Sequence, residues 1–152
     1  MAAAADRVQN NTSETVNRII HADMLERLIF FALHPERIEE RLHALDEEWD
    51  VERALEANAS VFALSGLTLG VLSSRRWLAL PALVAGFLLQ HAIQGWCPPL
   101  PVLRRLGFRT QREIDQERYA LKAMRGDFRQ VEEAMSRLQA ARAPRESGVE
   151  LM

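Results

Sequence analysis

The segment from Ala57 to Leu103 constrains the fold more than any other, because it contains only two charged residues, the adjacent Arg75 and Arg76. This pair divides the segment into two uncharged runs. The first run ends at Ser74, and as a helix it would be about 27 Å long, close to the thickness of a bilayer's hydrocarbon core. The sequence therefore predicts that this run spans a membrane.

The second run begins at Trp77 and is longer than the first. Gly95 and the prolines that follow it are expected to end its helix near Trp96 or Cys97, which leaves about twenty spanning residues. The predicted fold class is an all-α membrane protein, with a two-span transmembrane helical hairpin over residues 57–97 and flanking amphipathic cytoplasmic helices. Because 26% of the residues are charged, a soluble all-helical protein with two wholly buried central helices is the competing interpretation.

The overall composition does not imply a charge-driven partner for the chain. Its 152 residues carry a formal net charge of −2, which does not favour nucleic-acid binding. Cys97 is the single cysteine, so an internal disulfide, a CxxC redox pair and a cysteine-rich zinc site are excluded. The partners expected are the lipid bilayer and either other membrane-protein subunits or a second copy of the chain, with no nucleic acid.

The segment before the spans, residues 12–56, has the pattern of an amphipathic helical region that Pro35 divides into two helices. In the second of these helices apolar residues recur at spacings of three and four, and this helix is able to run unbroken into the first span. The remaining segments are a disordered N-terminus (1–11), a Pro/Arg-rich juxtamembrane segment (98–113), an amphipathic heptad helix (114–142) and a disordered tail (143–152).

The heptad helix predicted over residues 114–142 carries an apolar seam. From Leu121 onward the apolar residues are separated by three, four, three, four and three positions, and Gly126 is expected to interrupt the helix only slightly. Such a seam supports either a coiled coil with a second copy or pairing with the N-terminal helices, and the sequence leaves both open. The interaction seam consists of Leu121, Met124, Phe128, Val131, Met135 and Leu138.

The arginines around the spans predict the orientation of the hairpin. Two spans joined by a short loop place both termini on one side of the membrane, and the loop contains only Arg75 and Arg76. The positive-inside rule therefore predicts a bacterial inner (cytoplasmic) membrane protein with both termini in the cytoplasm. The arginines on the terminal side are Arg37, Arg41, Arg53, Arg104, Arg105, Arg109, Arg112 and Arg118.

Small residues separated by four positions occur in both spans. Gly66 and Gly70 form a GxxxG motif in the first span, and Ala82 and Gly86 form a similar motif in the second. Such motifs allow the backbones of two membrane helices to approach closely. Packing of the two motifs against each other is the simplest interpretation, and oligomerisation is the alternative.

The most specific pattern in the chain is Gly95-Trp96-Cys97-Pro98, followed by Leu106-Gly107. With the preceding hairpin it resembles the YgaP-like transmembrane domain family, whose two-helix inner-membrane modules have a second span that ends in Gly-x-Cys-Pro, followed by a Leu-Gly pair. The resemblance covers about residues 52–108 and implies a membrane hairpin that dimerises in the members fused to a rhodanese domain. The segment before the hairpin is too short for a rhodanese domain and lacks a cysteine, so sulfurtransferase activity does not carry over.

Two residues are candidates for chemistry. Cys97 lies just past the second span, where it is most simply a small apolar residue at a turn, and a reactive thiolate would have only Arg104 and Arg105 nearby to lower its pKa. His91 lies within the span, one to two turns from its end. An intramembrane histidine is a candidate cofactor or proton-transfer residue, although it can also simply bond to water or a carbonyl. The sequence predicts no catalytic residue, metal or cofactor.

The function predicted is that of a non-enzymatic integral membrane protein, an anchor, scaffold or accessory subunit of a larger membrane complex. This prediction rests on the amphipathic helical surfaces and on the lack of a catalytic motif. The alternative is a redox- or sulfur-linked membrane module that uses Cys97 or His91 with a partner in trans. A transporter is not favoured, because two spans do not enclose a pathway without oligomerising.

Overall fold

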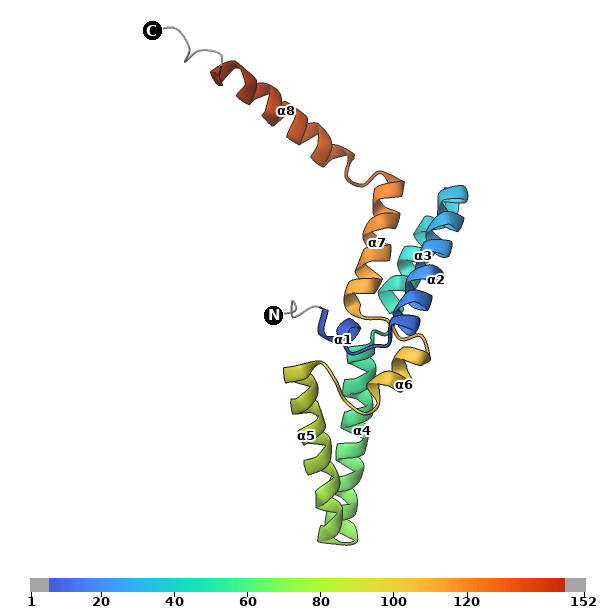
Figure 1. The fold of residues 1–152 in the computed structure, drawn as a ribbon, viewed down its shortest axis with the longest axis vertical. Helices are drawn as coiled ribbons and strands as arrows, with labels where there is room; N and C mark the ends of the chain where they lie inside the picture. The colour runs from blue at the N-terminus through green and yellow to red at the C-terminus, as the bar shows by residue number, and fades with distance from the viewer. Residues whose placement is uncertain (1–5, 147–152) are drawn as a thin grey trace.

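The computed structural model describes residues 6–146, and that part of the chain is helical with no strand, as the sequence predicts. Figure 1 shows the course of the chain. The elements in order are α1 (Arg7–Asn10), α2 (Glu14–Leu33), η2 (Pro35–Arg37), α3 (Ile38–Glu47), α4 (Val51–Leu72), η3 (Arg75–Leu78), α5 (Ala79–Gln94), α6 (Leu100–Arg105), α7 (Gln111–Arg125) and α8 (Arg129–Glu146), where η denotes a 3₁₀ helix.

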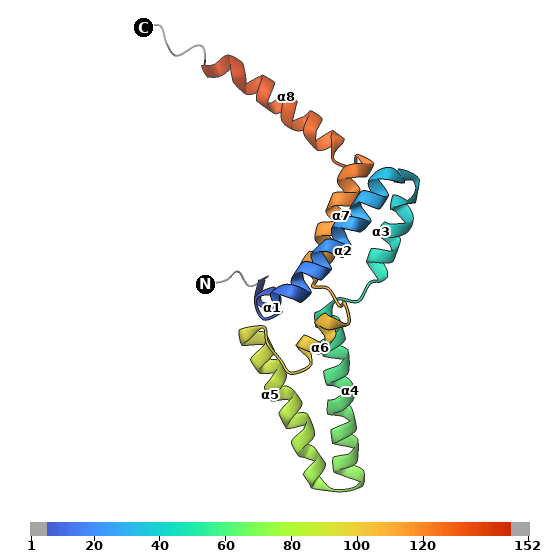
Figure 2. The ribbon, with the colours of Figure 1, turned by 45° about the vertical axis from the view of Figure 1, so that its right-hand side comes forward.

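The helices form two regions that meet at α6. Helices α4 and α5 make a hairpin at one end of the molecule, and α2, α3 and α7 make a bundle at the other end (Figure 1). Helix α1 lies beside the end of α5 (Figure 2), and α8 extends away from both regions. The predicted division between a hairpin and flanking helices therefore corresponds to two regions in space.

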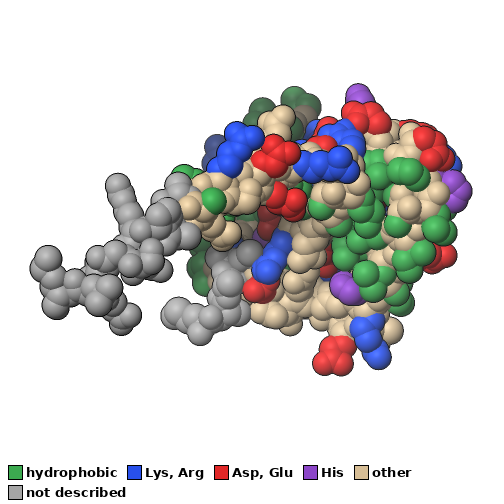
Figure 3. All heavy atoms as spheres, turned by 90° about the horizontal axis from the view of Figure 1, so that it is seen from above, with side chains coloured by type: hydrophobic (Ala, Val, Ile, Leu, Met, Phe, Trp, Pro, Cys, Tyr) green, Lys and Arg blue, Asp and Glu red, His purple; other side chains and the backbone are tan. Residues whose placement is uncertain are grey.

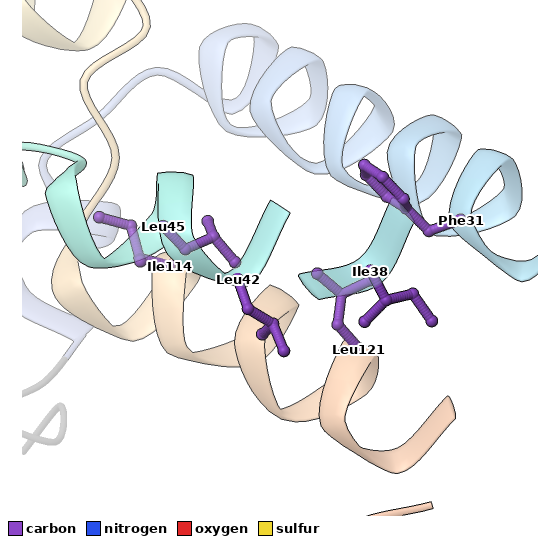
Figure 4. Close-up of a cluster of buried hydrophobic side chains, with 6 residues drawn as sticks. All are labelled: Phe31, Ile38, Leu42, Leu45, Ile114 and Leu121. Carbon is purple, nitrogen blue, oxygen red and sulfur yellow. The ribbon is translucent and has the colours of Figure 1, made fainter. Parts of the chain in front are cut away.

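The bundle has a compact apolar core, shown in Figure 4. Helix α3 supplies one stripe of it, because residues spaced by four and three positions lie on one face of a helix. Leu45 and Ile114 are each 1% exposed and Leu121 is fully buried, so α7 packs closely on α3. The core cluster consists of Phe31, Ile38, Leu42, Leu45, Ile114 and Leu121.

Side-chain caps fix where the helices begin. Ser13 accepts a hydrogen bond from the backbone N–H of Val16 at the start of α2, and Asp50 accepts one from the backbone N–H of Arg53 (2.6 Å) at the start of α4. The backbone of Glu48 is extended, so α3 ends before α4 begins. The alternative in which this helix runs unbroken into the first span is therefore wrong, because the Asp50 cap starts a new helix there.

The hairpin is closed at its loop end by glycines on α4. A Cβ added at Gly66 would lie 2.5 Å from Cδ of Pro81, and one added at Gly70 would lie 2.5 Å from Cδ2 of Leu78. At Gly86 an added Cβ would meet nothing within 4 Å, and Ala82 is exposed. The predicted packing of the two small-residue motifs against each other is therefore wrong, because α4 meets the beginning of α5 instead.

The two spans bury little of their apolar surface within the chain. The helical segment that ends with α4 and the segment formed by η3 and α5 are both long and apolar enough to cross a membrane. Only 17% of the most apolar part of the first segment is buried, and none of that of the second. A core helix of a soluble protein would be mostly buried. The fold therefore does not contain the two wholly buried central helices that the competing interpretation requires. The exposed apolar residues of α4 are Val61, Phe62, Leu64, Leu67, Leu69, Val71 and Leu72.

The predicted heptad helix over residues 114–142 is divided in two. Gly126 has a φ of +89°, so α7 ends at Arg125, and Arg125 forms an ion pair with Asp127 just beyond it. Leu121 lies in the bundle core, whereas the other five residues of the interaction seam are exposed. The prediction of a slight interruption is therefore wrong, because a left-handed glycine ends the helix.

The chain ends also differ from prediction. Residues 7–10, expected to be disordered, form α1, because Val8 is 4% exposed and packs in a cluster with α4 and α6. Helix α8 continues to Glu146, so the first residues of the predicted disordered tail are helical. The rest of both predicted disordered ends, residues 1–5 and 147–152, lies outside the described residues.

Candidate functional site

The sequence candidates come together where the hairpin joins the bundle, beginning with the turn after α5. Gly95 has a φ of +74°, and its N–H donates to the carbonyl of His91 (2.7 Å), which ends the helix. A Cβ at Gly95 would also collide with the Cβ of Arg7 on α1. Glycine is therefore required here both for its backbone conformation and for the close approach of α1.

Cys97 is a packed core residue of this junction. It is 3% exposed and belongs to an apolar cluster with Val51, Leu55 and Leu100. Burial raises the pKa of the Cys97 thiol, and a backbone hydrogen bond with Leu100 acts in the opposite direction with a smaller effect. A buried, protonated thiol is a poor nucleophile, so the geometry does not support thiol chemistry at this residue.

The remaining residues of the Gly-x-Cys-Pro pattern shape the chain around α6. Pro98 is exposed, and the following Pro99 stands at the N-cap position of α6. Gly107, beyond the end of α6, has a φ of +91°, and its N–H donates to the carbonyl of Arg104 (3.1 Å). An added Cβ at Gly107 would meet nothing within 4 Å, so glycine serves the backbone conformation here and not a close contact.

His91 and Cys97 line the same cavity, which has a volume of about 480 Å³. It lies between α4, α5 and the segment that contains α6, and most of its lining side chains are apolar. His91 is half-buried, and its Nδ1 is buried with no hydrogen-bond partner among residues 6–146. The structure therefore places His91 and Cys97, the two residues that the sequence singles out, on the same apolar cavity. Within the described residues, no hydrogen bond joins them.

A buried ion pair that the sequence pattern did not predict connects α6 to α7. Arg104 of α6 donates from Nη1 to Oε2 of Glu113 (2.7 Å) and from Nη2 to Oε1 (2.8 Å). Its other hydrogen bonds go to the hydroxyl of Thr12, the side-chain carbonyl of Asn17 and the backbone carbonyl of Phe108. Arg104 is 1% exposed, and its hydrogen bonds connect α6 to α7 and to the start of α2.

A second cluster joins all three helices of the bundle around Glu117, which is fully buried. Arg41 of α3 donates from Nε to its Oε1 (2.7 Å), and Arg27 of α2 and Arg109 pair with its Oε2. Arg109 also forms a two-pronged pair with Glu48, at 2.7 Å for each bond. Since the backbone carbonyl of Arg109 accepts from the N–H of Val51, this cluster reaches the first residue of α4.

Electrostatics keeps both networks ionised. Burial opposes the charge on Glu113, but hydrogen bonds from Arg104, from the backbone of Thr110 and from Gln9 bring the pKa of Glu113 below its ordinary value. For Glu117, burial also opposes ionisation, and the Arg41 hydrogen bond and the charge of Arg109 lower its pKa. The two networks together connect α2, α3 and α7 of the bundle to α6 and to the start of α4.

A signal for these glutamates was present in the sequence. Glu113 and Glu117 stand eight and four positions before Leu121, so they continue the apolar face of α7. An acidic residue on the apolar face of a helix indicates a buried ionic partner. Their partners lie outside α7, Arg104 in α6 and Arg109 just before α7, and the sequence pattern identifies these two residues only as cations near the predicted spans.

Within residues 6–146 no group of three or more His, Cys, Asp or Glu side chains is placed to hold a metal ion. Comparison of the chain with models of known protein families, with curated proteins and with solved structures gives no match.

Proposed function

We propose that this chain is a non-enzymatic integral protein of the bacterial inner membrane that anchors a helical bundle beside the bilayer, as a scaffold or accessory subunit of a larger complex. One observation carries the proposal: α4 packs its glycines, Gly66 and Gly70, against the beginning of α5, while both helices direct large apolar side chains outward. In water that surface would be strongly unfavourable, whereas lipid solvates it, and small residues allow membrane helices to pack closely.

Tryptophans at both ends of the hairpin support insertion. Trp77 follows the loop arginines, and Trp96 follows α5 at the opposite end. Trp49, just before α4, packs its ring 4.5 Å from the guanidinium carbon of Arg53. Because α4 is about 33 Å long, these aromatic residues stand at the separation of the two interfaces of a bilayer, where tryptophan is enriched.

The orientation proposed places the bundle and both termini in the cytoplasm. The start of α4 and the end of α5 lie at the same end of the hairpin, next to the bundle (Figure 2). That side holds most of the arginines near the spans, and the positive-inside rule counts arginines whether or not they are paired. The loop with Arg75 and Arg76 would then lie across the membrane, where long side chains can reach headgroup phosphates.

We also propose that the chain is a member of the YgaP-like transmembrane family, because it has the pattern formed by Gly95, Cys97, Pro98 and Gly107. The structure gives these residues turning and packing roles, which suit a membrane module without chemistry of its own.

The outer face of α2 supports an accessory role. Seen from above, Figure 3 shows hydrophobic side chains gathered at the side of the molecule where α2 and α3 lie. Ile29 and Leu33 are 65% and 73% exposed, and Ile19 and Leu25 continue the same apolar surface along α2. An apolar surface of this kind on a soluble bundle is typical of a protein contact.

Insertion and orientation are tested with single cysteines in a Cys97→Ala background. Ser74→Cys lies in the loop and Ser136→Cys on the exposed side of α8. On bacterial spheroplasts, a membrane-impermeant maleimide is expected to label Ser74→Cys directly and Ser136→Cys only after permeabilisation. The reverse pattern would overturn the orientation, and release of the protein by alkaline carbonate would overturn insertion.

The accessory role is tested by mild-detergent purification of the tagged chain from its native membranes. We expect stoichiometric recovery with membrane-protein subunits, lost in Ile29→Asp and retained in Ala44→Asp, an exposed site on α3 that receives the same change. Recovery of the wild-type chain alone would contradict the accessory role.

A further inference from the structure

The hairpin is closed at one end and separated at the other. Gly66 and Gly70 hold α4 against the beginning of α5, while at the far end α6 packs beside α4 and the two spans diverge (Figures 1 and 2). The cavity of about 480 Å³ lies in that divergence. Its volume falls within the range of about 300–1,000 Å³ that is usual for small-molecule sites.

The walls of this cavity are continuous with the outward surface of the spans. Phe62, Leu83 and Leu88 line it and are also 54%, 55% and 39% exposed. Among residues 6–146, no Asp, Glu, Lys or Arg lines it. If the hairpin is inserted as proposed, a molecule dissolved in the bilayer can enter from the side, and the site offers no charge to bind an anionic headgroup.

The polar groups of the cavity gather at one end. Asn58 stands two turns into α4 and His91 one turn before the end of α5, so both lie near the α6 end, while Leu80 and Leu83 lie toward the loop. Asn58 uses one N–H to bond the carbonyl of Ala54 (2.7 Å) and has a second N–H. His91 is the other polar residue of the lining. Its Nδ1 is enclosed by protein atoms, so a bound molecule meets the part of the half-buried imidazole that remains exposed.

We propose that this cavity binds a lipid-soluble quinone, with the ring carbonyls near His91 and Asn58 and the apolar tail toward the loop end. The inference rests on the proposed membrane insertion. A quinone is uncharged, its carbonyls accept hydrogen bonds from imidazole and amide N–H groups, and its flat ring suits the aromatic faces of Phe62 and Phe87. Phospholipids and fatty acids bring a charged head for which the lining has no counter-charge.

The test is equilibrium dialysis of decylubiquinone against the purified full-length protein in neutral-detergent micelles. Wild type is expected to bind one molecule saturably. Ala59→Trp fills the cavity and should weaken binding by at least tenfold, whereas Ala82→Trp adds the same bulk to the outward face of α5 and should leave it unchanged. His91→Leu should weaken binding about tenfold by removing a hydrogen bond, and keeps the test decisive if Ala59→Trp does not fold.

Three results would overturn the site: no saturable binding to wild type, equal affinity of the two tryptophan variants, or full affinity in His91→Leu. Displacement of decylubiquinone by oleate or phosphatidylglycerol at equal concentration would overturn the choice of a quinone. Carbonate extraction of the membranes from which the protein is purified distinguishes the two proposals, because a chain that resists extraction but binds no quinone refutes this site alone.

Discussion

The hairpin and the bundle are built from the same kind of element but place their apolar side chains in opposite directions. In the bundle, Leu45 and Leu121 are buried between helices. In the hairpin, Gly66 and Gly70 are buried between the helices while Val71 and Leu72 are about four-fifths exposed (82% and 78%). The bundle has the pattern of a region that folds in water, and the hairpin has the pattern that the proposed membrane insertion requires. Water drives apolar groups together, whereas in lipid close backbone packing takes over that role.

The junction between the regions is where charges are buried. Arg104, Arg109, Glu113 and Glu117 are each less than 10% exposed, and each has a charged partner. A bundle held only by its apolar core would be free to swing on the spans, but these pairs connect α6 and the start of α4 to α7. The stability of the bundle and its position on the hairpin are thus coupled through the same residues.

Breaking the charge network is expected to have the largest effect on the bundle. Glu117→Gln removes the partner of Arg41 and Arg109 in a buried site, which should lower the free energy of unfolding by about 3–5 kcal/mol. Urea denaturation in micelles, followed by circular dichroism, measures it. The matched change Glu40→Gln removes the exposed pair with Arg37 and should cost less than about 1 kcal/mol. Equal effects of the two changes would refute a structural role for the Glu117 cluster.

In the hairpin, the sensitive positions are expected to be the small ones. Gly66→Leu places a side chain where Pro81 already lies, and overpacking of this kind should cost about 1–3 kcal/mol. Gly86→Leu is the control, because nothing stands within 4 Å of its added Cβ. Thermal unfolding of both variants in the same detergent gives the comparison. A larger loss in Gly86→Leu would show that the outward face of α5 is the packed one.

The two regions also differ in how much of them could be predicted from sequence. The hairpin was predictable because burying charge in lipid is so unfavourable that two uncharged runs around Arg75 and Arg76 almost define it. The helix faces that meet in the hairpin were not predictable, because a four-residue spacing identifies the small residues but does not show that Gly66 meets Pro81. The sequence predicts only a slight interruption at Gly126, whereas the helix ends there. A glycine's backbone conformation depends on the tertiary packing around it, which the sequence does not show.

The candidate site was predicted only in part for a similar reason. His91 and Cys97 were singled out, and the structure places both on one cavity. The buried pairs of Arg104 and Arg109 were not foreseen, because a sequence shows charges but not the partners that lie 9 or 61 positions away. Pairing that is distant along the chain depends on topology, which composition and periodicity do not specify.

Acid is expected to destabilise the bundle but not the hairpin. Because the pKa of Glu113 and of Glu117 is lowered in the folded bundle, the unfolded chain binds more protons between the folded and ordinary pKa values. The stability they contribute is therefore complete above about pH 4.5 and is lost as the pH falls through their folded-state pKa values. Residues 57–97 carry no carboxylate. Circular dichroism from pH 7 to 3 in micelles should show partial helix loss, and Glu113→Gln should reduce this pH dependence. A hairpin that melts in the same range would contradict the prediction.

The smallest effect is expected on α8, which shares a sequence seam with the bundle but not its core. Leu138 is 67% exposed, so Leu138→Ser should change the free energy of unfolding by no more than about 0.5 kcal/mol. Leu121, in the same seam, is fully buried, and Leu121→Ala should cost about 2–5 kcal/mol. Both are measured by urea denaturation at two protein concentrations. The contradicting result is that Leu138→Ser destabilises the protein, and does so more strongly at the higher concentration. In that case a second copy covers α8. The heptad spacing from Phe128 to Leu138 then serves assembly and not the fold of one chain.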